Sequence, residues 1–453
     1  MPFTSPMWSR LTSLRGLKIL VLTNLYPPQL ADTDDFRCQN VTEALRARGH
    51  TVRVLTSNHG VATEQRDALV ERRLHLNGVF GAELVKGFGD LQDLETHNNE
   101  VLREALASFA PEVVHVWSMR GISKSLLLTL RRAGRPTVFD VADNWMTEEL
   151  RTDPWLAWWH AEQVSLPHKL HRLAIELWGE RKKWDATMPT FIEPDVKRLP
   201  DVFDSDGTAQ FKPNAIAAFQ FRRLYFSSEA LKSLTMQSGF RVSRGVVIHP
   251  GVDTNLFHGE VKPPGAPVKK FLVVVRLTPH CGVSTVIAAL QLVRAQGAKA
   301  TLSVFGRGSS EVLARLRTQA VQAELPVEFR TGGLQRDLPE IYRAHDAFIY
   351  PVEREEMFVS APLEAMACGL PVIVNEDYGA SDLFRSRESC HSFPSGDPGL
   401  LANRMLELIE QHEFRCKIAQ TGQNEVLTRY QFPTSVDEIE RYVADTVALG
   451  MGG

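Results

Sequence analysis

Two glutamates, Glu356 and Glu364, stand at the start of a short predicted helix, where a ligand could bind. The residues at 365–367 favour a helix, Gly369 suits its C-terminal cap, and Pro371 prevents its continuation. The free N–H groups and the dipole at a helix N-terminus favour bound anions. The pattern indicates a site for an anionic ligand, although a charge that pairs with the helix dipole is the simpler interpretation of either glutamate alone.

Further polar or flexible residues directly follow apolar runs that predict buried strands. Arg276 follows FLVVV, Gly306 and Gly308 follow TLSVF, and Glu356 comes soon after AFIY. Ligands of open α/β sheets bind beyond the carboxyl ends of strands, so we expect these residues at one edge. The Gly-x-Gly turn lacks the third glycine of a dinucleotide site, because Glu311 takes its place, so a structural turn is an equal interpretation. The sequence has no Walker motif and no Gly-x-Ser-x-Gly elbow, which disfavours phosphoryl transfer of that type and an α/β-hydrolase.

The composition is typical of a soluble globular protein, with 43% hydrophobic and 23% charged residues. The formal net charge of -3 leaves no surplus of cations, so we expect no nucleic-acid partner. Five dispersed cysteines without a Cys-x-x-Cys pair indicate reduced thiols and argue against a zinc site. We therefore expect neither a metal ion nor an organic cofactor.

The sequence predicts a cytoplasmic protein. It has no apolar run of the roughly 18 residues that a membrane span requires, and its N-terminus lacks a signal-peptide core. Basic and aromatic residues alternate with apolar ones from His168 to Trp184, which makes peripheral contact with a membrane surface the alternative there. A solvated helix packed along one side is the simpler interpretation, because Glu176 and Glu180 dilute its positive face.

The order of predicted elements indicates an α/β protein. An apolar strand begins at Lys18, a helix spans Asn40–Gly49, and the next strand spans His50–Thr56. This alternation continues, and it predicts parallel, doubly wound sheets. A second series of strands and helices begins after a Pro-, Gly- and Lys-rich stretch. Two Rossmann-like domains that face a central cleft are the predicted architecture.

The predicted boundaries divide the 453 residues into four parts. The N-terminal domain covers 1–258, a linker covers 259–270, the C-terminal domain covers 271–430, and a helix within 431–453 packs back on the N-terminal domain. A tryptophan-rich insertion at 144–222 belongs to the N-terminal domain. Its tryptophans are expected in a core or an interface, with an aromatic wall for a substrate as the alternative.

Nearly the whole chain resembles the retaining glycosyltransferases of the GT-B fold, in particular the large family 4 of nucleotide-sugar transferases. The matching blocks include, in order, ILVLTNLYPP, ALRARGHTVRVLT, PEVVHVW, YFSSEAL, PGVDTNLF, RLTPHCGVSTVIAAL and IYRAHDAFIYP. The most specific block has Glu356, seven further residues, Glu364 and then AMACGLPV. The resemblance implies a nucleotide-sugar donor bound by the C-terminal domain, and an acceptor (a sugar, lipid or small molecule) bound by the N-terminal domain.

The resemblance also implies roles for individual residues of the donor site. Glu364 would bind the ribose hydroxyls and Glu356 would contact the transferred sugar near its reacting carbon, because carboxylates accept hydrogen bonds from hydroxyls. Arg276 would stabilise the negative charge that builds on the departing diphosphate. Further donor contacts are expected from Phe358, Val359, Ser360, Gly282, Gly306 and Gly308, and from the backbone near Gly333 and Leu334 for the nucleobase.

One departure from the family pattern removes a positive charge. Cys281 stands before Gly282 where the family usually has a lysine. One of two expected cations is therefore missing beside the leaving group. Arg307 and Arg120, each close to a predicted strand end, are candidates to replace it.

Two further departures lie on the implied acceptor side. The loop after the double proline reads Asp32-Thr33-Asp34-Asp35 instead of Gly-Gly-x-Glu. An exposed turn, an acidic wall for a cationic or polyhydroxylated acceptor, and a metal site are the alternatives for this loop. Ala142 stands where many relatives have a histidine, and Asp143 beside it is the remaining catalytic candidate.

The resemblance thus implies a retaining glycosyltransferase with an unidentified acceptor. The three departures motivate a rival, a GT-B-like binding or partner subunit whose active site has degenerated. A glycoside hydrolase is a more distant alternative, because its two carboxylates must flank the bond that is broken.

Overall fold

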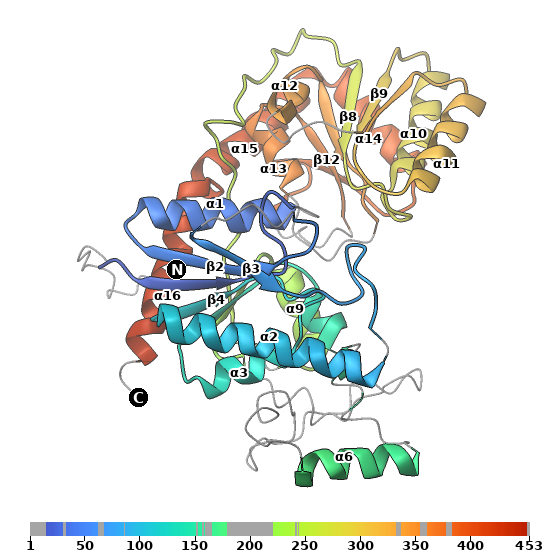
Figure 1. The fold of residues 1–453 in the computed structure, drawn as a ribbon. Helices are drawn as coiled ribbons and strands as arrows, with labels where there is room; N and C mark the ends of the chain where they lie inside the picture. Colours follow the sequence, from blue (N-terminus) through green and yellow to red (C-terminus); the bar gives the residue numbers. More distant parts are fainter. Residues whose placement is uncertain are drawn as a thin grey trace. The chain divides into compact units, whose positions relative to one another are not determined.

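The structure is a computed structural model of the chain. It describes residues 15–29, 33–61, 68–85, 87–150, 153–155, 158, 165–178, 221–240, 242, 244–331, 337–353, 360–376 and 383–450. The chain forms two compact units: unit 1 comprises Met1–Tyr225, Leu234–Val246 and Glu438–Gly453, and unit 2 comprises Phe226–Ser233 and Val247–Asp437. Figure 1 shows a sheet with its flanking helices at each of two places in the chain.

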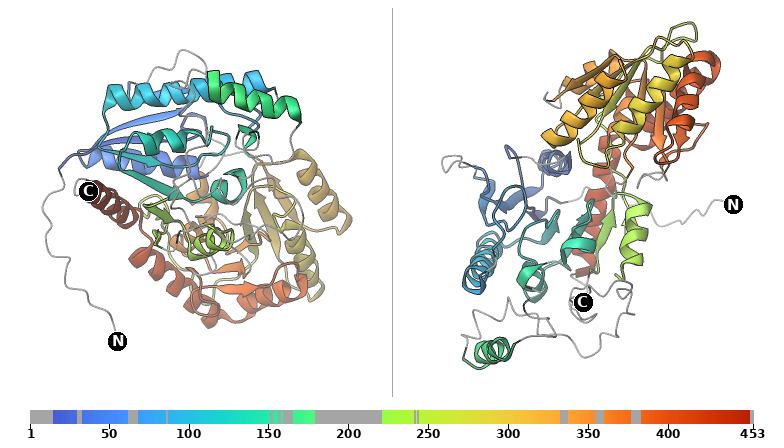
Figure 2. Two further views of the ribbon diagram at one scale, coloured as in Figure 1. Left: turned by 90° about the horizontal axis from the view of Figure 1, so that it is seen from below. Right: turned by 90° about the vertical axis from the view of Figure 1, so that its right-hand side faces the viewer.

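The first sheet has seven strands in the order β3-β2-β1-β4-β5-β6-β7. The strands are β1 (Lys18–Leu22), β2 (Thr51–Ser57), β3 (Val70–Leu74), β4 (Val113–Val116), β5 (Thr137–Val141), β6 (Leu224–Phe226) and β7 (Val246–Val247). The helices of this part of the chain are α1 (Thr33–Ala47), α2 (Phe88–Phe109), α3 (Leu126–Arg132), α6 (Leu166–Trp178) and α9 (Glu229–Gln237). Figures 1 and 2 show α1 on one face of this sheet and α2 on the other. Central strands such as β4 are buried at every position because both faces are covered.

The second sheet has six strands in the order β10-β9-β8-β11-β12-β13. These are β8 (Lys270–Val274), β9 (Thr301–Phe305), β10 (Val327–Arg330), β11 (Ala347–Tyr350), β12 (Val372–Asn375) and β13 (His391–Phe393). Its helices are α10 (Val283–Ala295), α11 (Ser310–Gln322), α12 (Leu338–Arg343), α13 (Ala361–Ala367), α14 (Pro398–Glu410) and α15 (His412–Arg429). Each neighbouring pair is parallel, which places the carboxyl ends of all these strands at one edge.

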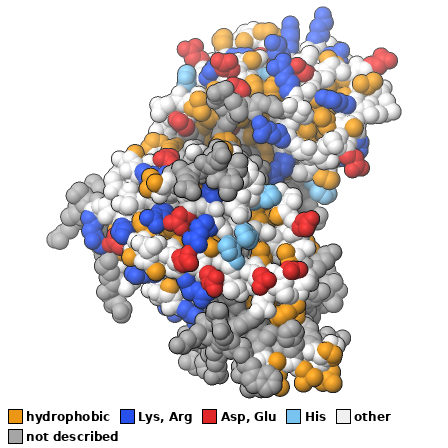
Figure 3. Space-filling model, viewed as in Figure 1, with side chains coloured by type: hydrophobic (Ala, Val, Ile, Leu, Met, Phe, Trp, Pro, Cys, Tyr) orange, Lys and Arg blue, Asp and Glu red, His pale blue; other side chains and the backbone are white. Residues whose placement is uncertain are grey.

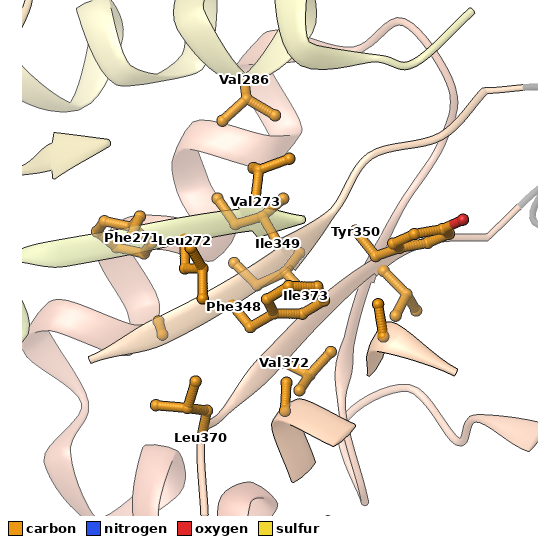
Figure 4. Close-up of a cluster of buried hydrophobic side chains, with 14 of the residues drawn as sticks. Phe271, Leu272, Val273, Val286, Phe348, Ile349, Tyr350, Leu370, Val372 and Ile373 are labelled. Carbon is orange, nitrogen blue, oxygen red and sulfur yellow. The ribbon is translucent and has the colours of Figure 1, made fainter. Parts of the chain in front are cut away.

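The core of unit 2 forms where apolar strands meet apolar helix faces. Figure 4 shows Val286 of α10 above Val273 and Ile349, which lie on the neighbouring strands β8 and β11. All three side chains are buried. Four of the five cysteines are buried as well: Cys38 in unit 1, and Cys281, Cys368 and Cys390 in unit 2.

The prediction of an α/β protein with parallel, doubly wound sheets is confirmed by the two observed sheets. One predicted boundary is wrong, because the helix expected from Asn40 begins at Thr33. Thr33, Asp34 and Asp35 therefore belong to the first turn of α1 and not to a loop. Acidic residues favour the first turn of a helix, where they face the positive end of its dipole.

The segment from 258 to 270 is held within unit 2 by buried and half-buried side chains. Arg415, which is only 3% exposed, donates to the carbonyl oxygens of Pro264 at 2.8 Å and Ala266 at 2.9 Å. Gln423 donates to the Gly259 carbonyl at 2.8 Å. Lys262 pairs with Asp346 at 2.6 Å. This segment therefore forms part of unit 2, where the carbonyl groups of Gly259 and Pro264 have hydrogen-bond partners.

The last helix, α16 (Phe432–Gly450), contributes its residues from Glu438 onward to unit 1. Glu440 pairs with His50 at 2.9 Å. Tyr442 donates a hydrogen bond to the Leu224 carbonyl at 2.9 Å. These contacts tie the end of the chain to β6 and to the residue that precedes β2.

Candidate functional site

Glu364 is the best-defined candidate residue in unit 2. It lies on α13, and its side chain is buried, with the residue only 5% exposed. Ser360 donates its hydroxyl to one carboxylate oxygen at 2.6 Å, and Tyr342 donates to the other at 3.1 Å. Burial raises the pKa of Glu364, and these two hydrogen bonds oppose that rise because they favour the ionised form.

Tyr342 reaches Glu364 from α12, the helix that precedes β11. Its ring packs edge-on against Phe257 and Phe348, with ring centroids 6.0 and 5.6 Å away. Burial and the nearby Glu364 raise the pKa of Tyr342 well above its usual value, so the phenol keeps its proton and remains a donor. Tyr342 is not among the residues predicted from the sequence, because no local spacing links it to a glutamate on another helix. The sequence predicts a role for the backbone N–H of Ser360, and the position of Ser360 one helical turn before Glu364 is the signal for its side-chain contact.

Arg276 directly follows Val275 at the carboxyl end of β8 and is exposed. The neighbouring segment after β9 runs beside it, since the Leu277 N–H donates to the Arg307 carbonyl at 2.8 Å. The Ser309 N–H in turn donates to the Leu277 carbonyl at 3.0 Å. The predicted convergence of Arg276 with the Gly-x-Gly turn is therefore present at this sheet edge.

The glycines of that turn are needed for close backbone packing. A Cβ atom on Gly306 would lie 2.0 Å from the Val275 carbonyl oxygen, and one on Gly308 would lie 2.4 Å from that of Leu277. The Gly306 N–H donates to the Arg330 carbonyl at 3.1 Å, so it is already engaged. Close backbone packing therefore explains why glycine occupies both positions, independently of any ligand.

Gly282 lies at the same edge of the sheet, where its loop packs closely against the loop after β11. It has a φ of +69°, and a Cβ atom there would lie 1.8 Å from the Pro351 carbonyl oxygen. Gly282 is the N-cap residue of α10 and, as a glycine, has no side chain to cap the helix. Thr285 in the first turn of α10 donates to Glu353 at 2.9 Å, which ties this helix to the loop after β11. The N–H groups at the start of α10 and the dipole of this helix can receive an anion such as a phosphate.

Cys281 does not supply the cation that a lysine would bring. It is 2% exposed and packs in the hydrophobic core of unit 2. Burial raises the pKa of the Cys281 thiol, so it stays protonated and unreactive at neutral pH. The contribution of this side chain is to packing.

Asp143 lies in unit 1, two residues after the end of β5. Ser118 donates its hydroxyl to the Asp143 carboxylate at 2.6 Å, and the Trp145 N–H donates at 3.0 Å. Asp143 is 5% exposed, and burial raises its pKa to about 6. A small pocket with room for about one water lies beside it. The residues that line this pocket are Thr23, Cys38, Trp117, Ser118, Asp140, Ala142 and Asp143.

Replacing Asp143 by asparagine is expected to change how stability depends on pH. Because the folded-state pKa lies above the ordinary value, the native state binds more protons than the unfolded state between about pH 4 and 6. The free energy of unfolding should therefore fall as pH rises through that window, and Asp143→Asn should remove this fall. Denaturant melts of both proteins at several pH values measure the difference. The exposed Asp445→Asn is the control, and a pH-independent difference for Asp143→Asn would count against the assignment.

Two buried ion pairs support the strand ends around Asp143. Lys124, which is 2% exposed, contacts Glu149 at 3.0 Å, and Arg120 contacts the same carboxylate at 3.5 Å. Arg37 on α1 binds Asp140 on β5 through two hydrogen bonds of 3.0 and 2.6 Å. Arg120 thus belongs to a charge network inside unit 1.

Several predicted site residues lie outside the described part of the chain. These are Glu356, Phe358, Val359, Gly333, Leu334 and Asp32. Of the tryptophans in the predicted insertion, Trp145 and Trp155 are fully buried. Among the residues that the structure describes, no group of His, Cys, Asp and Glu side chains is arranged to hold a metal ion.

Comparisons with known families match both halves of the chain. The family described as glycosyl transferases group 1 matches residues 260–425. The family described as the glycosyl transferase 4-like domain matches residues 36–174. The first match contains Arg276, Gly282, Ser360 and Glu364, and the second contains Asp143.

Individual relatives match part of the chain in sequence and most of it in structure. A Salmonella typhimurium protein assigned provisionally as a colanic acid biosynthesis glycosyltransferase is 31% identical over 166 residues, which is 35% of this chain and 40% of the relative. The phosphatidyl-myo-inositol mannosyltransferase of Mycobacterium leprae is 28% identical over 170 residues, or 38% of this chain and 44% of the relative. The chain thus spans less than half the length of these relatives. The crystal structure of Anabaena HepE in complex with UDP-glucose covers 95% of this chain and 100% of its own, with a TM-score of 0.61 and 18% identity, which supports the GT-B fold.

Proposed function

We propose that this chain is a retaining glycosyltransferase that moves a sugar from a nucleotide-diphosphate sugar to an acceptor, because the glycosyl transferases group 1 family and the glycosyl transferase 4-like domain match its residues 260–425 and 36–174. The observation that carries the proposal is the buried Glu364, whose two oxygens each accept a hydrogen bond from a neighbouring side chain. A carboxylate fixed in this way is preorganised to accept hydrogen bonds from the two hydroxyls of a ribose.

The other donor contacts follow from charge and backbone geometry. Arg276, exposed at the carboxyl end of β8, opposes the negative charge that develops on the leaving diphosphate. The start of α10, at Gly282, binds a phosphate through its N–H groups. Glu356 contacts the transferred sugar. The N–H groups of Phe358, Val359 and Ser360 hold sugar and diphosphate oxygens, and the backbone near Leu334 contacts the nucleobase.

On the acceptor side, the proposal assigns Asp143 and the 32–35 stretch of unit 1. Asp143 is held by Ser118 and the Trp145 N–H, so its carboxylate has a fixed position from which it can orient an acceptor hydroxyl. The acceptor class is a sugar, a lipid or a small molecule. The reaction requires neither a metal ion nor an organic cofactor in this proposal. The proposed location is the cytoplasm, at or near a membrane surface.

One specific observation favours a second candidate, a binding or partner subunit without turnover. Cys281 replaces a lysine and is buried in the core, so no cation is supplied from that position. Removal of one preorganised charge-stabilising group from an active site costs roughly a hundredfold or more in rate. A chain that binds the donor but transfers nothing would match this candidate.

The test is a thermal-shift titration with UDP, GDP, ADP, TDP and their common sugar conjugates, followed by hydrolysis and transfer assays with the nucleotide that binds. The HepE complex with UDP-glucose makes UDP-sugars the first donors to try. A ligand at about 100 times its Kd adds roughly 2.7 kcal/mol to stability, which a melting curve detects. Binding with turnover supports the transferase, binding without turnover supports the partner subunit, and no shift with any nucleotide contradicts both.

A further inference from the structure

Helix α6 exposes a stripe of large apolar side chains. Leu166, Leu170 and Leu173 are 69%, 56% and 48% exposed. Their spacing of four and then three residues places them on one face of the helix. In Figure 3, hydrophobic side chains gather in the region where Figure 1 labels α6. Contiguous apolar exposure of this kind on a soluble protein marks a surface that contacts something else.

Positive charge accompanies the leucine stripe. Lys169 is exposed beside it, and Arg172 lies one residue before Leu173. Within α6, the sequence carries two Lys or Arg residues and one Glu residue, with two further histidines. The chain as a whole has a net charge of -3, so this positive charge is local. An anionic partner therefore complements α6 better than it complements the rest of the chain.

A different side of α6 is anchored, which leaves the leucines exposed to a partner. Arg172 donates to the Trp158 carbonyl and lies over the Trp158 ring, 5.5 Å from its centroid. Trp158 in turn packs against Phe88 at the start of α2, with ring centroids 4.4 Å apart. Arg172 lies about 100° from Leu173 around a helix, because successive residues are separated by that angle. The leucine stripe is not the face that these contacts use.

We propose that α6 binds the surface of an anionic lipid bilayer. The three leucines insert at the boundary between headgroups and acyl chains, and the exposed Lys169 contacts the anionic headgroups. No helix in the described ranges is long and apolar enough to cross a membrane, so this contact lies on the surface. Lipid binding in this proposal does not depend on sugar transfer.

The experiment is co-sedimentation of the full chain with vesicles of phosphatidylcholine alone or mixed with phosphatidylglycerol. Binding should be at least about tenfold tighter to the anionic vesicles and should weaken as salt is raised, because headgroup attraction is screened. The triple variant Leu166→Gln/Leu170→Gln/Leu173→Gln should lose at least about tenfold in binding, since it removes the apolar area that enters the bilayer. Lys169→Glu should reduce binding to the anionic vesicles and leave binding to the phosphatidylcholine vesicles unchanged.

A matched control replaces three exposed apolar residues on other helices, Leu292, Val321 and Leu449, by glutamine. It should bind vesicles as the native chain does. Melting temperature and nucleotide binding, measured on every variant, separate loss of lipid contact from loss of fold or of the transferase site. Equal binding by native chain and triple variant would overturn the proposal. The proposal would also be overturned if the native chain did not bind vesicles but formed a dimer, seen by sedimentation velocity, that the triple variant did not form.

Discussion

Replacing Glu364 by glutamine is expected to weaken nucleotide binding by roughly ten- to a hundredfold. A hydrogen bond to a charged group contributes about 1.5–3 kcal/mol, and about 1.4 kcal/mol corresponds to tenfold in affinity. Glutamine keeps the size of the side chain but replaces one accepting oxygen by a donor amide. Isothermal titration at fixed salt, with the nucleotide that the native chain prefers, measures the change in Kd.

Affinity should also fall at low pH, because a protonated Glu364 loses an acceptor. Burial raises the pKa of Glu364, so the fall begins at a higher pH than for an ordinary glutamate. Tyr342→Phe removes a hydrogen bond that favours the ionised form, so it should move this fall to still higher pH. Glu388→Gln, whose side chain is 63% exposed, is the matched control. An unchanged Kd in a folded Glu364→Gln protein would refute the ribose-binding role.

Arg37→Met is expected to destabilise unit 1 by about 3–5 kcal/mol. The side chain of Asp140 is only 1% exposed, and Arg37 supplies two of its hydrogen bonds. Removing one partner of a buried ion pair leaves an uncompensated buried charge, and the cost of that charge sets the magnitude. Urea denaturation followed by the fluorescence of the buried Trp117 and Trp145 measures the free energy of unfolding.

Two further variants separate buried charge from side-chain packing. Arg37→Met/Asp140→Leu should be more stable than Arg37→Met alone, because it removes the stranded carboxylate. Arg53→Met breaks a pair with Glu71 in which the side chains are 28% and 24% exposed, and it should cost at most about 1 kcal/mol. Similar losses for Arg37→Met and Arg53→Met would show that burial of the pair is not the cause.

The fold could be predicted where apolar runs dominate. The predicted strand that begins at Lys18 matches β1, and the predicted strand His50–Thr56 matches β2 to within one residue at each end, because both are apolar runs. β3 (VERRL) was not predicted, because three of its five residues are charged and only its two ends are buried. Such a strand at the edge of a sheet has no apolar alternation for a sequence pattern to detect.

The candidate site could be predicted only where a residue type and its local spacing carry the information. Glu364 and Arg276 were named from the sequence, the first by a spacing and the second by its place after a strand. Tyr342 was not, because its contact with Glu364 joins two helices and depends on tertiary packing. The burial of Cys281 could not be predicted either, because neither the residue type nor its neighbours in the sequence specify that the side chain is buried.

The distribution of cysteines gives each unit its own chemical reporter of opening. Burial raises the pKa of both Cys368 and Cys390 to about 12, so in the native state few thiolates are available to an alkylating reagent. Cys38 becomes reactive when unit 1 opens, whereas Cys368 and Cys390 become reactive when unit 2 opens. Mass spectrometry of alkylated peptides can therefore time the opening of each unit in a single unlabelled chain.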